Sequence, residues 1–384
     1  MMAADGYFIY TAGFVPLGVT RVRIDESLTV IPAYAFDEKP NIEEVDCHDG
    51  VKTVEKYAFA KFPSLRRVIM PGVEVVEECA FNCCEALRFV ECGKLERIGF
   101  GAFDGCKSLT CINLPSAEKV EEYAFRNCPS LRIVRMPGVE VVAYGAFEYC
   151  KALEDVECGK LEIIRHHHAF CCCESLESVD LPSGKTVEPF AFAGCEALIN
   201  VKFGKELESI RYGEFQGCTS LERITIPLKD GIITADNIFQ GCKNLKHIDL
   251  VEGVHETIAA LLLEDWKNDM NEEINSINQI LSCTPAGSGD SFDDVGGKAL
   301  AIRMGISSVL RKIIHYKAQH QRYLNEAAST LHHTLPQDIM ENNVLPFVEL
   351  PSYTFEVGDH EEEDNLFIIS VTFSDDEEGG DDER

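Results

Sequence analysis

The fold of this chain is decided by one stretch, Ala124-Phe125-Arg126-Asn127-Cys128-Pro129-Ser130-Leu131-Arg132-Ile133-Val134-Arg135-Met136-Pro137-Gly138. Its pattern, A-F-x-x-C-x-x-L-x-x-V-x-M-P, recurs from residue 36 to residue 250. Ten phenylalanines, spaced 22 to 24 residues apart, anchor the copies: Phe36, Phe59, Phe81, Phe103, Phe125, Phe147, Phe170, Phe192, Phe215 and Phe239. A fixed period of this length is typical of a solenoid, in which each repeat is one unit stacked on the last.

Each repeat contains a short segment in which apolar and polar residues alternate. After each Phe, Leu or Ile follows by six residues, Val or Ile by nine, and another apolar residue or Cys by eleven. Alternation with a period of two is typical of a half-buried strand. Pro-Gly or Pro-Ser follows in several repeats and ends the strand in a turn. The segment Glu121–Asn127 has the length of about two helical turns.

This pattern resembles the leucine-rich repeat of the BspA-like, or Treponema-type, class, whose usual form is A-F-x-x-C-x-x-L-x-x-I-x-L-P. The resemblance covers residues 22–250 in ten copies. It implies an α/β fold: a right-handed, curved solenoid in which a parallel β-sheet lines the concave side. The class includes surface proteins, so the resemblance leaves open a role in adhesion.

The repeats divide the chain into parts. We expect residues 1–21 to form an N-terminal cap that covers the apolar end of the repeats at 22–250. Apolar residues three or four apart in 251–334 predict two helices, joined by a flexible Gly- and Ser-rich linker at 284–297. The helices either form a hairpin that caps the C-terminal end of the solenoid, which we favour, or a separate dimerising pair.

The last part of the chain changes in composition. Residues 335–355 predict an extended segment, and residues 356–384, with thirteen acidic residues against one Arg, predict a disordered tail. Phe367–Val371 resembles a SUMO-interacting motif, a short strand that adds to the edge of its partner's sheet. Ser374–Glu377 resembles an acidophilic kinase site. Because both patterns are short, we favour a solubilising tail with one apolar patch.

The net charge of the 384-residue chain is −30, which bears on its partners. Nucleic acids and anionic membranes repel an acidic protein, so we expect neither as a partner. No apolar run approaches the ~20 residues that span a bilayer. Met1–Tyr7 lack the basic start and apolar core of a signal peptide. We therefore expect a reduced, cytoplasmic or nuclear monomer.

Seventeen cysteines are the most obvious candidates for chemistry. Eight of them form a ladder, each three residues after its Phe: Cys84, Cys106, Cys128, Cys150, Cys173, Cys195, Cys218 and Cys242. The functional interpretation is metal binding or redox sensing, whereas the alternative is a small side chain that fills one core layer per turn. Zinc sites favour C-x-x-C pairs, which the chain lacks. We favour core packing.

One local cluster is rich in metal-ligand atoms: His166-His167-His168 and Cys171-Cys172-Cys173. It lies where the repeat is one residue longer, so an insertion also explains it, and we expect no metal or other cofactor. Enzyme motifs are missing as well. Gly297-Lys298 lacks the other residues of a P-loop. We therefore expect no catalytic site.

On the predicted concave sheet, residues seven, eight and ten positions after each Phe should face solvent. From the N-terminus they give an acidic start, a basic patch interrupted by Glu91, an acidic block that continues to Asp180, and a mixed end. The candidate partner-binding residues are Arg66, Arg67, Ile69, Arg88, Phe89, Arg132, Ile133, Arg135, Glu154, Asp155 and Glu157. Phe89 and Ile133 among arginines have the composition of interface hot spots. The alternative is a solvated surface of mixed charge.

These observations predict a non-enzymatic scaffold that binds a protein partner through the concave face of its repeats. A cell-surface protein that mediates adhesion is the alternative within binding proteins. From another class, the cysteines leave open a metal-binding redox protein or an enzyme, which stoichiometric metal in the purified protein would reveal.

Overall fold

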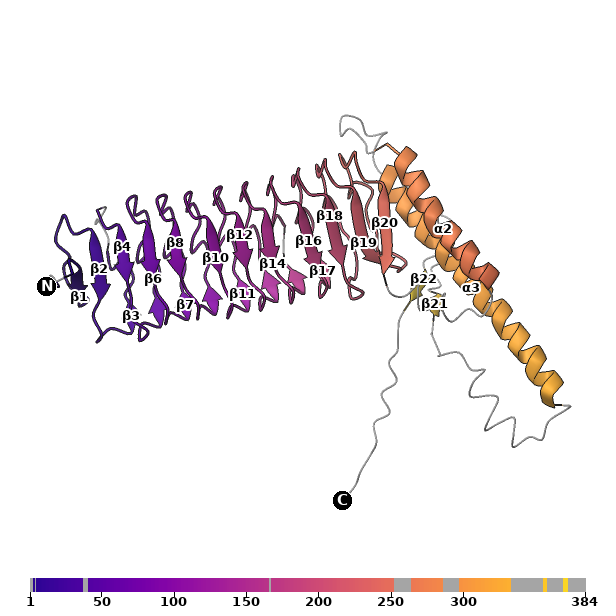
Figure 1. Ribbon diagram of the computed structural model, residues 1–384, viewed down its shortest axis with the longest axis horizontal. Coiled ribbons are helices and arrows are strands. Elements are labelled where there is room, and N and C mark those ends of the chain that lie inside the picture. Colours follow the sequence, from indigo (N-terminus) through magenta and orange to yellow (C-terminus); the bar gives the residue numbers. More distant parts are fainter. Residues whose placement is uncertain are drawn as a thin grey trace, which may run out of the picture.

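The structure, a computed structural model, describes residues 3, 5–36, 41–165, 167–251, 264–285, 297–332, 355–357 and 369–371. The repeats form a parallel-sheet solenoid of about ten turns, and a pair of helices lies at its C-terminal end (Figure 1). The predicted α/β solenoid with a helical C-terminal segment is therefore confirmed. Most turns contribute one strand to each of two sheets, and the second sheet ends at β17 (Thr186–Val187).

The first sheet is the one predicted from the alternating segments. Its strands are β1 (Phe8–Tyr10), β2 (Arg21–Ile24), β4 (Glu44–Asp46), β6 (Arg67–Ile69), β8 (Phe89–Glu91), β10 (Cys111–Asn113), β12 (Ile133–Arg135), β14 (Asp155–Glu157), β16 (Ser178–Leu181), β18 (Asn200–Phe203), β19 (Arg223–Pro227) and β20 (His247–Val251). All pairs are parallel, and hydrogen bonding divides the sheet into three sections, β1 to β8, β10 to β14 and β16 to β20. We call its solvent side the long-strand face.

The second sheet was not predicted from the sequence. It consists of two-residue parallel strands: β3 (Val30–Ile31), β5 (Thr53–Val54), β7 (Val75–Val76), β9 (Arg97–Ile98), β11 (Lys119–Val120), β13 (Val141–Val142), β15 (Ile163–Ile164) and β17 (Thr186–Val187). The second residue of each strand is buried and the first is partly exposed, as in Val75 and Val76. A strand of two residues is too short to show an alternation of apolar and polar residues, so the sequence does not predict these strands.

The core between the sheets is built from equivalent side chains of successive turns. The ten anchoring Phe rings stack on one another along the solenoid, with centroids 4.9 to 5.8 Å apart and planes within 16° of parallel. All ten are buried, and so are the strand residues nine positions after them in nearly every turn. The pattern that identified the repeat therefore describes its packed interior.

The segment that contains each Phe is a turn, and the expected two helical turns are absent from it. Left-handed residues stand two positions before and two positions after the Phe, as in Tyr123 (φ 57°) and Asn127 (φ 56°) around Phe125. An α-helix requires negative φ throughout, so this pair of residues excludes one. Gly105 and three equivalent glycines occupy the later position in other turns, and this signal was available in the sequence.

The backbone of these turns forms hydrogen bonds between repeats. The N–H of Phe125 donates to the carbonyl of Ala146 in the next turn at 2.8 Å, and the same bond recurs from Phe59 to Phe215. A helix would use the same groups internally, whereas this turn uses them to bind its neighbour. Each repeat is therefore joined to the next by two sheets and by this third series of bonds.

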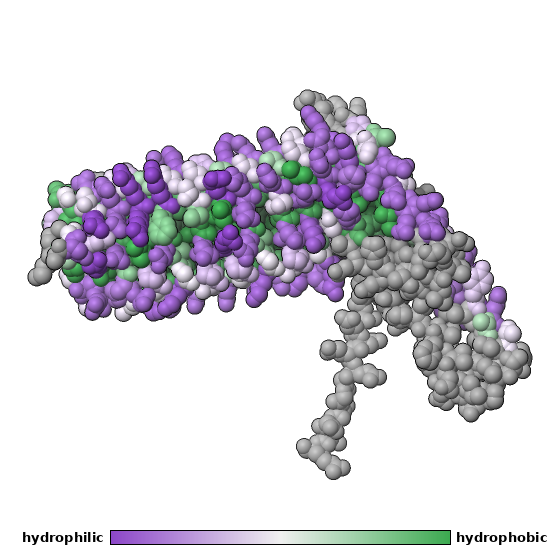
Figure 2. All heavy atoms as spheres, in the orientation of Figure 1, coloured by the Kyte–Doolittle hydropathy of each residue, from purple (hydrophilic) through white to green (hydrophobic). Residues whose placement is uncertain are grey.

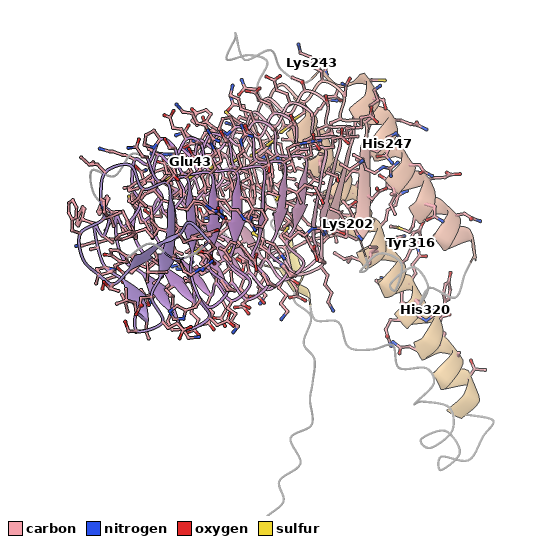
Figure 3. The ribbon with its side chains drawn as sticks, turned by 60° about the vertical axis from the view of Figure 1, so that its left-hand side comes forward. Glu43, Lys202, Lys243, His247, Tyr316 and His320 are labelled. Atoms are coloured by element: carbon pink, nitrogen blue, oxygen red, sulfur yellow. The ribbon has the colours of Figure 1, made fainter. Side chains whose placement is uncertain are left out.

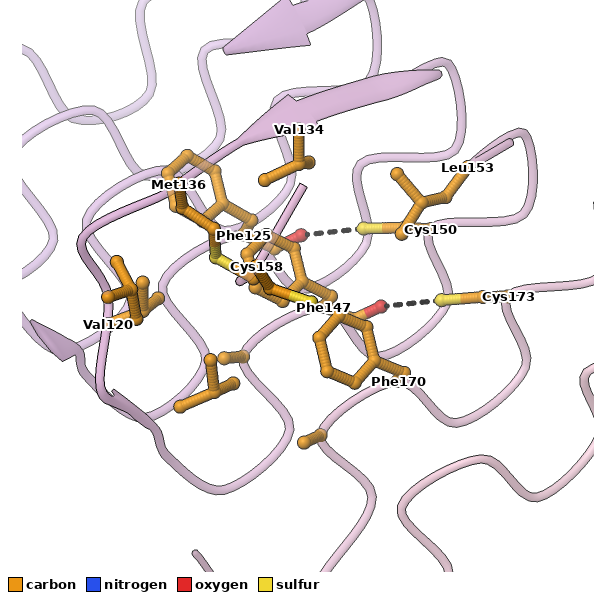
Figure 4. Packing of buried hydrophobic residues seen from close by; sticks show 14 of the residues in the cluster. Val120, Phe125, Val134, Met136, Phe147, Cys150, Leu153, Cys158, Phe170 and Cys173 are labelled. Atoms are coloured by element: carbon orange, nitrogen blue, oxygen red, sulfur yellow. Dashed lines mark hydrogen bonds between the residues drawn. The ribbon is translucent and has the colours of Figure 1, made fainter. Parts of the chain in front are cut away.

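The cysteine ladder completes the turn. Each of its eight thiols donates to the carbonyl of the Phe in the preceding repeat, at 3.0 to 3.3 Å: Cys84, Cys106, Cys128, Cys150, Cys173, Cys195, Cys218 and Cys242. Figure 4 shows two of these bonds, from Cys150 to Phe125 and from Cys173 to Phe147. A thiol fits because it is small and apolar enough for the core and still donates a hydrogen.

We expect Cys150→Val to lower the free energy of unfolding by about 1–3 kcal/mol, because valine fills the space and leaves the Phe125 carbonyl without this donor. Cys150→Ser should cost less, since the hydroxyl can still donate. Urea denaturation followed by circular dichroism measures both, with the exposed Cys283→Val as the control. Equal losses for the valine and serine variants would contradict a donor role.

The helices cover the C-terminal end of the solenoid (Figure 1). Helix α2 (Glu264–Cys283) contacts both β20 and helix α3 (Gly297–His332), and the backbone N–H of Ile248 in β20 donates to the Asn278 side chain of α2. Gly305 lets the helices approach closely, since a Cβ there would lie 2.5 Å from Ile277 Cγ1. Figure 3 shows Tyr316 and His320 farther along α3.

Lys298 fastens the helix pair to the last repeat. Its buried ammonium donates to the carbonyl of Leu245 in the solenoid at 2.5 Å and to that of Leu281 in α2 at 2.9 Å. Burial lowers the pKa of Lys298, so these charge-assisted bonds stabilise an ammonium that its surroundings otherwise disfavour. Helix α2 thus packs on β20, and the choice between a capping hairpin and a dimerising pair stays a prediction.

We expect Lys298→Met to loosen the helix pair, because both carbonyls lose a charged donor worth about 1.5–3 kcal/mol. Amide hydrogen exchange should accelerate at least about tenfold in α2 and in the first turns of α3 and stay unchanged near Phe125. Lys246→Met, which changes an exposed lysine close by, is the control. Unchanged exchange in α2 would show that Lys298 does not fasten it.

Several predicted segments lie partly or wholly outside the described residues. These are residues 252–263, most of the linker at 284–297, nearly all of 335–355, and most of the acidic tail. Within the last two, β21 (Phe355–Val357) pairs antiparallel with β22 (Ile369–Val371). The end of the SUMO-like motif therefore pairs with a strand of its own chain.

At the N-terminal end, β1 adds a parallel strand to β2. Tyr7 and Tyr10 are buried there as expected of a cap, whereas Phe14 is 77% exposed.

Candidate functional site

The long-strand face carries an apolar row at its centre. Phe89 of β8, Cys111 of β10 and Ile133 of β12 occupy equivalent positions in three successive turns. Phe89 is 41% exposed and Ile133 36% exposed, although both are large and apolar. Figure 2 shows a broken band of hydrophobic colour along the solenoid between rows of hydrophilic side chains. The predicted outward positions therefore face solvent, and Cys111 joins them.

The arginines around this row are mostly paired within the chain. Arg132 donates to both carboxylate oxygens of Glu154, at 2.9 and 2.8 Å, and Arg135 lies 3.0 Å from Glu157. At the N-terminal side, Arg66 and Arg67 lie 3.8 and 3.7 Å from Glu43 and Glu44, respectively. The expected basic patch and acidic block are therefore neighbours that largely neutralise each other.

The pairing follows from the repeat length. Arg132 and Glu154 are 22 residues apart, as are Arg135 and Glu157, so each pair occupies equivalent positions in successive turns. Parallel strands lie ~4.8 Å apart, within reach of these side chains. The basic patch and the acidic block were predicted from the sequence, whereas the ion pairs between them were not. Surface pairs contribute at most about 1 kcal/mol each, so they matter here mainly because they remove free charge from the face.

Of the eleven candidate residues, Arg88 and Asp155 have no ion pair with any described residue. Arg67 also lies over the Phe89 ring, with its Cζ 5.4 Å from the centroid. Ile69 is half-buried beside them. The candidate residues thus form one continuous surface in which an apolar row is bordered by paired charges.

The charge balance changes toward β14 and β16. Asp155 is exposed, and so is Glu177 in the next turn, and neither carboxylate has a cation within 4.0 Å among the described residues. Asp180 has only a distant partner, Lys202 at 4.0 Å, whose side chain Figure 3 labels. The apolar row therefore ends, on its C-terminal side, in unpaired negative charge.

Burial keeps most thiols of the cysteine ladder in the unreactive, protonated form. Burial raises the pKa of Cys84, Cys150 and Cys242 to about 12, and that of Cys128 well above its ordinary value. Metal ligation and nucleophilic attack both require the thiolate, which such burial disfavours. In the part of the chain that the structure describes, no three His, Cys, Asp or Glu side chains are placed to hold a metal ion.

The histidine and cysteine cluster is spread over different surroundings. Cys173 belongs to the ladder, and the Sγ atoms of Cys171 and Cys172 lie 3.5 Å apart. His168 is stacked on Phe190, with centroids 5.4 Å apart, and His166 lies outside the described residues. The described members therefore act in packing.

His168 belongs to a second exposed feature that the sequence analysis missed. Six turns in succession place aromatic rings in contact along one edge of the solenoid, 5.1 to 5.9 Å apart: Phe100, Tyr123, Tyr144, His168, Phe190 and Tyr212. The ring stands two residues before the anchoring Phe, or three before it where glycine occupies the left-handed position, as at Gly145. Because these rings pack on one another across successive turns, we infer that they stabilise the fold.

Glu214 is the one fully buried acidic side chain among the described residues. It occupies the position before Phe215, where the eight earlier repeats all have alanine. Its Oε2 accepts a hydrogen bond from the backbone N–H of Arg211, and its Oε1 has no partner. Burial raises its pKa well above 4.5, so the carboxyl group holds its proton in the folded state.

Because the unfolded chain loses this proton first as pH rises, Glu214 destabilises the fold increasingly above about pH 4.5. We expect Glu214→Ala to raise the free energy of unfolding by about 1–3 kcal/mol, more at pH 7.5 than at pH 4. Glu214→Gln keeps an acceptor for Arg211 and should reduce the same pH dependence. Thermal unfolding across this pH range measures both; a gain independent of pH would contradict a buried, protonated carboxyl group.

None of the helices among the described residues is both long and apolar enough to cross a membrane.

A family model described as "BspA type Leucine rich repeat region (6 copies)" matches this chain over residues 9–132, 80–183 and 162–264. Together these matches cover about two-thirds of the chain. This chain belongs to the BspA-type leucine-rich repeat family. The Ala-Phe turn, the cysteine ladder and the parallel sheets therefore all lie within the matched repeat region of this chain. The resemblance found in the sequence is confirmed.

Solved structures of other leucine-rich repeat proteins are similar to this BspA-type chain. A leucine-rich repeat protein from Bacteroides ovatus is 20% identical, with a TM-score of 0.43, covering 64% of this chain and 69% of its own. A leucine-rich cell surface protein from Faecalibacterium prausnitzii is 19% identical, with a TM-score of 0.31 and coverage of 66% and 93%.

The Treponema pallidum leucine-rich repeat protein is 26% identical, with a TM-score of 0.34, and covers 43% of this chain and 82% of its own. No curated protein matches the sequence.

Proposed function

We propose that this protein is a non-enzymatic scaffold that binds a protein partner through the long-strand face. The observation that supports it is the apolar row of Phe89, Cys111 and Ile133, bordered by paired charges. Apolar side chains within a polar rim are the usual anatomy of a protein interface, and large central side chains carry most of its energy. The paired arginines add little free charge, so binding depends on the apolar row.

We place this binding inside the cell. The eight ladder thiols donate to backbone carbonyls, and a disulfide would remove each of these donors from the core. A reducing compartment such as the cytoplasm or nucleus keeps them as thiols.

The double variant Phe89→Ser, Ile133→Ser tests the proposal. It removes the two largest apolar side chains of the row, and each hot spot contributes at least about 2 kcal/mol to binding. Immobilised wild-type and variant proteins are compared for the partners they retain from an extract of the cells that express the chain. We expect a specific partner to be retained by wild type and lost from the variant, with the melting temperature unchanged.

Ile280→Ser is the matched control, because Ile280 is a large apolar side chain on α2, 51% exposed, away from the long-strand face. It should retain the partner. If the double variant keeps every partner that wild type keeps, or if Ile280→Ser loses the same one, the long-strand face is not the binding surface. Charge reversal of Arg132 or Arg135 would be a poorer test, since each would then face Glu154 or Glu157 with like charge.

A further inference from the structure

The distribution of free charge on the long-strand face restricts what kind of segment it accepts. Near β8, Arg88 directly before the strand and Glu91 at its end have no ion pair among the described residues and are opposite in sign. Near β14 and β16, the unpaired residues are Asp155 and Glu177, both acidic. The face is therefore neutral at one end of the apolar row and negative at the other.

The acidic residues next to Asp155 are already paired within the chain, so they are not free to bind a partner's cation. Glu154 is held by Arg132 in a two-pronged ion pair, and Glu157 by Arg135. A cation from a partner would have to compete with these arginines, whereas Asp155 between them is free. Asp155 also occupies the same position in its strand as Ile133 in β12, directly beside the end of the apolar row.

The distance between Phe89 and Asp155 determines how long a bound segment must be to contact both. Three strand intervals separate Phe89 from Asp155, or about 14 Å, since parallel strands lie ~4.8 Å apart. An extended chain advances ~3.4 Å per residue and places every second side chain on one side. A segment that runs along the solenoid therefore covers this distance in about four residues, with two apolar side chains and then one charged side chain facing the surface.

We propose that the long-strand face binds an extended, basic protein segment. Two alternate apolar side chains lie on the row of Phe89, Cys111 and Ile133, and a Lys or Arg about four residues after the first of them pairs with Asp155 and Glu177. This inference rests on the proposed function. It adds that the partner's segment is basic and that it runs along the solenoid with its basic residue toward β14 and β16. The net charge of −30 on the chain favours the approach of such a segment from a distance.

Two fluorescent nine-residue peptides test the proposal. Both carry Ile at positions 3 and 5 in a Gly/Ser background; one has Arg at position 7 and the other has Glu. We expect anisotropy titrations in 50 mM salt to show at least about fivefold tighter binding of the Arg peptide, and about 500 mM salt to reduce this preference. Equal affinity for the two peptides, or binding of neither, overturns the proposal.

The double variant Asp155→Asn, Glu177→Gln should lose most of the preference for Arg and leave binding through the apolar row in place. The control Glu118→Gln, Glu208→Gln removes the same charge from exposed sites outside this face and should keep the preference. If both double variants lose it equally, only the overall charge matters and the assigned pairing is wrong.

The outcomes separate this inference from the proposed function. If Phe89→Ser, Ile133→Ser loses its protein partner while wild type binds both peptides equally, the partner is not basic and the binding face stands. If that variant keeps its partner and binds the Arg peptide as wild type does, the apolar row is not the site and both proposals fail.

Discussion

Stacking of each anchoring Phe on the next is the contact on which the rest of this structure depends. The rings of Phe103 and Phe125 are 5.2 Å apart and within 1° of parallel, and this geometry recurs along the repeats. The backbone turns sharply around these rings, with left-handed residues on both sides of Phe103 and Phe125. That turn leaves the Phe carbonyl for the cysteine thiol and the Phe N–H for the next repeat.

The same regularity controls the surface. Equal repeats place equivalent residues in rows, so a change at one position of one repeat affects one point of a row and leaves the core intact. Paired rows such as Arg132 with Glu154 cancel charge, and apolar residues such as Phe89 and Ile133 form the row that we propose as the binding surface. Stability and recognition therefore depend on different residues of the same repeat, which is characteristic of solenoids.

The sequence predicted the features that repeat with a fixed period and missed those that depend on backbone conformation. The strand bearing Val134 and the buried role of Cys128 followed from alternation and spacing. The turn at Phe125 was expected to be helical from its length alone, whereas Asn127 and the glycines at the equivalent position of other turns favour left-handed φ. The outward positions were predicted correctly, whereas their ion pairs depend on register between turns and became clear only in the structure.

The most direct measurement uses the exposed thiol that the face itself provides. A photoreactive maleimide on Cys111, after Cys283→Ser, lies at the centre of the apolar row, and the same reagent on Cys283, after Cys111→Ser, lies on the terminal helix pair. The account predicts that illumination of the complex joins the partner to the chain labelled at Cys111 and leaves it unattached to the chain labelled at Cys283. A crosslink formed only from Cys283 would contradict it.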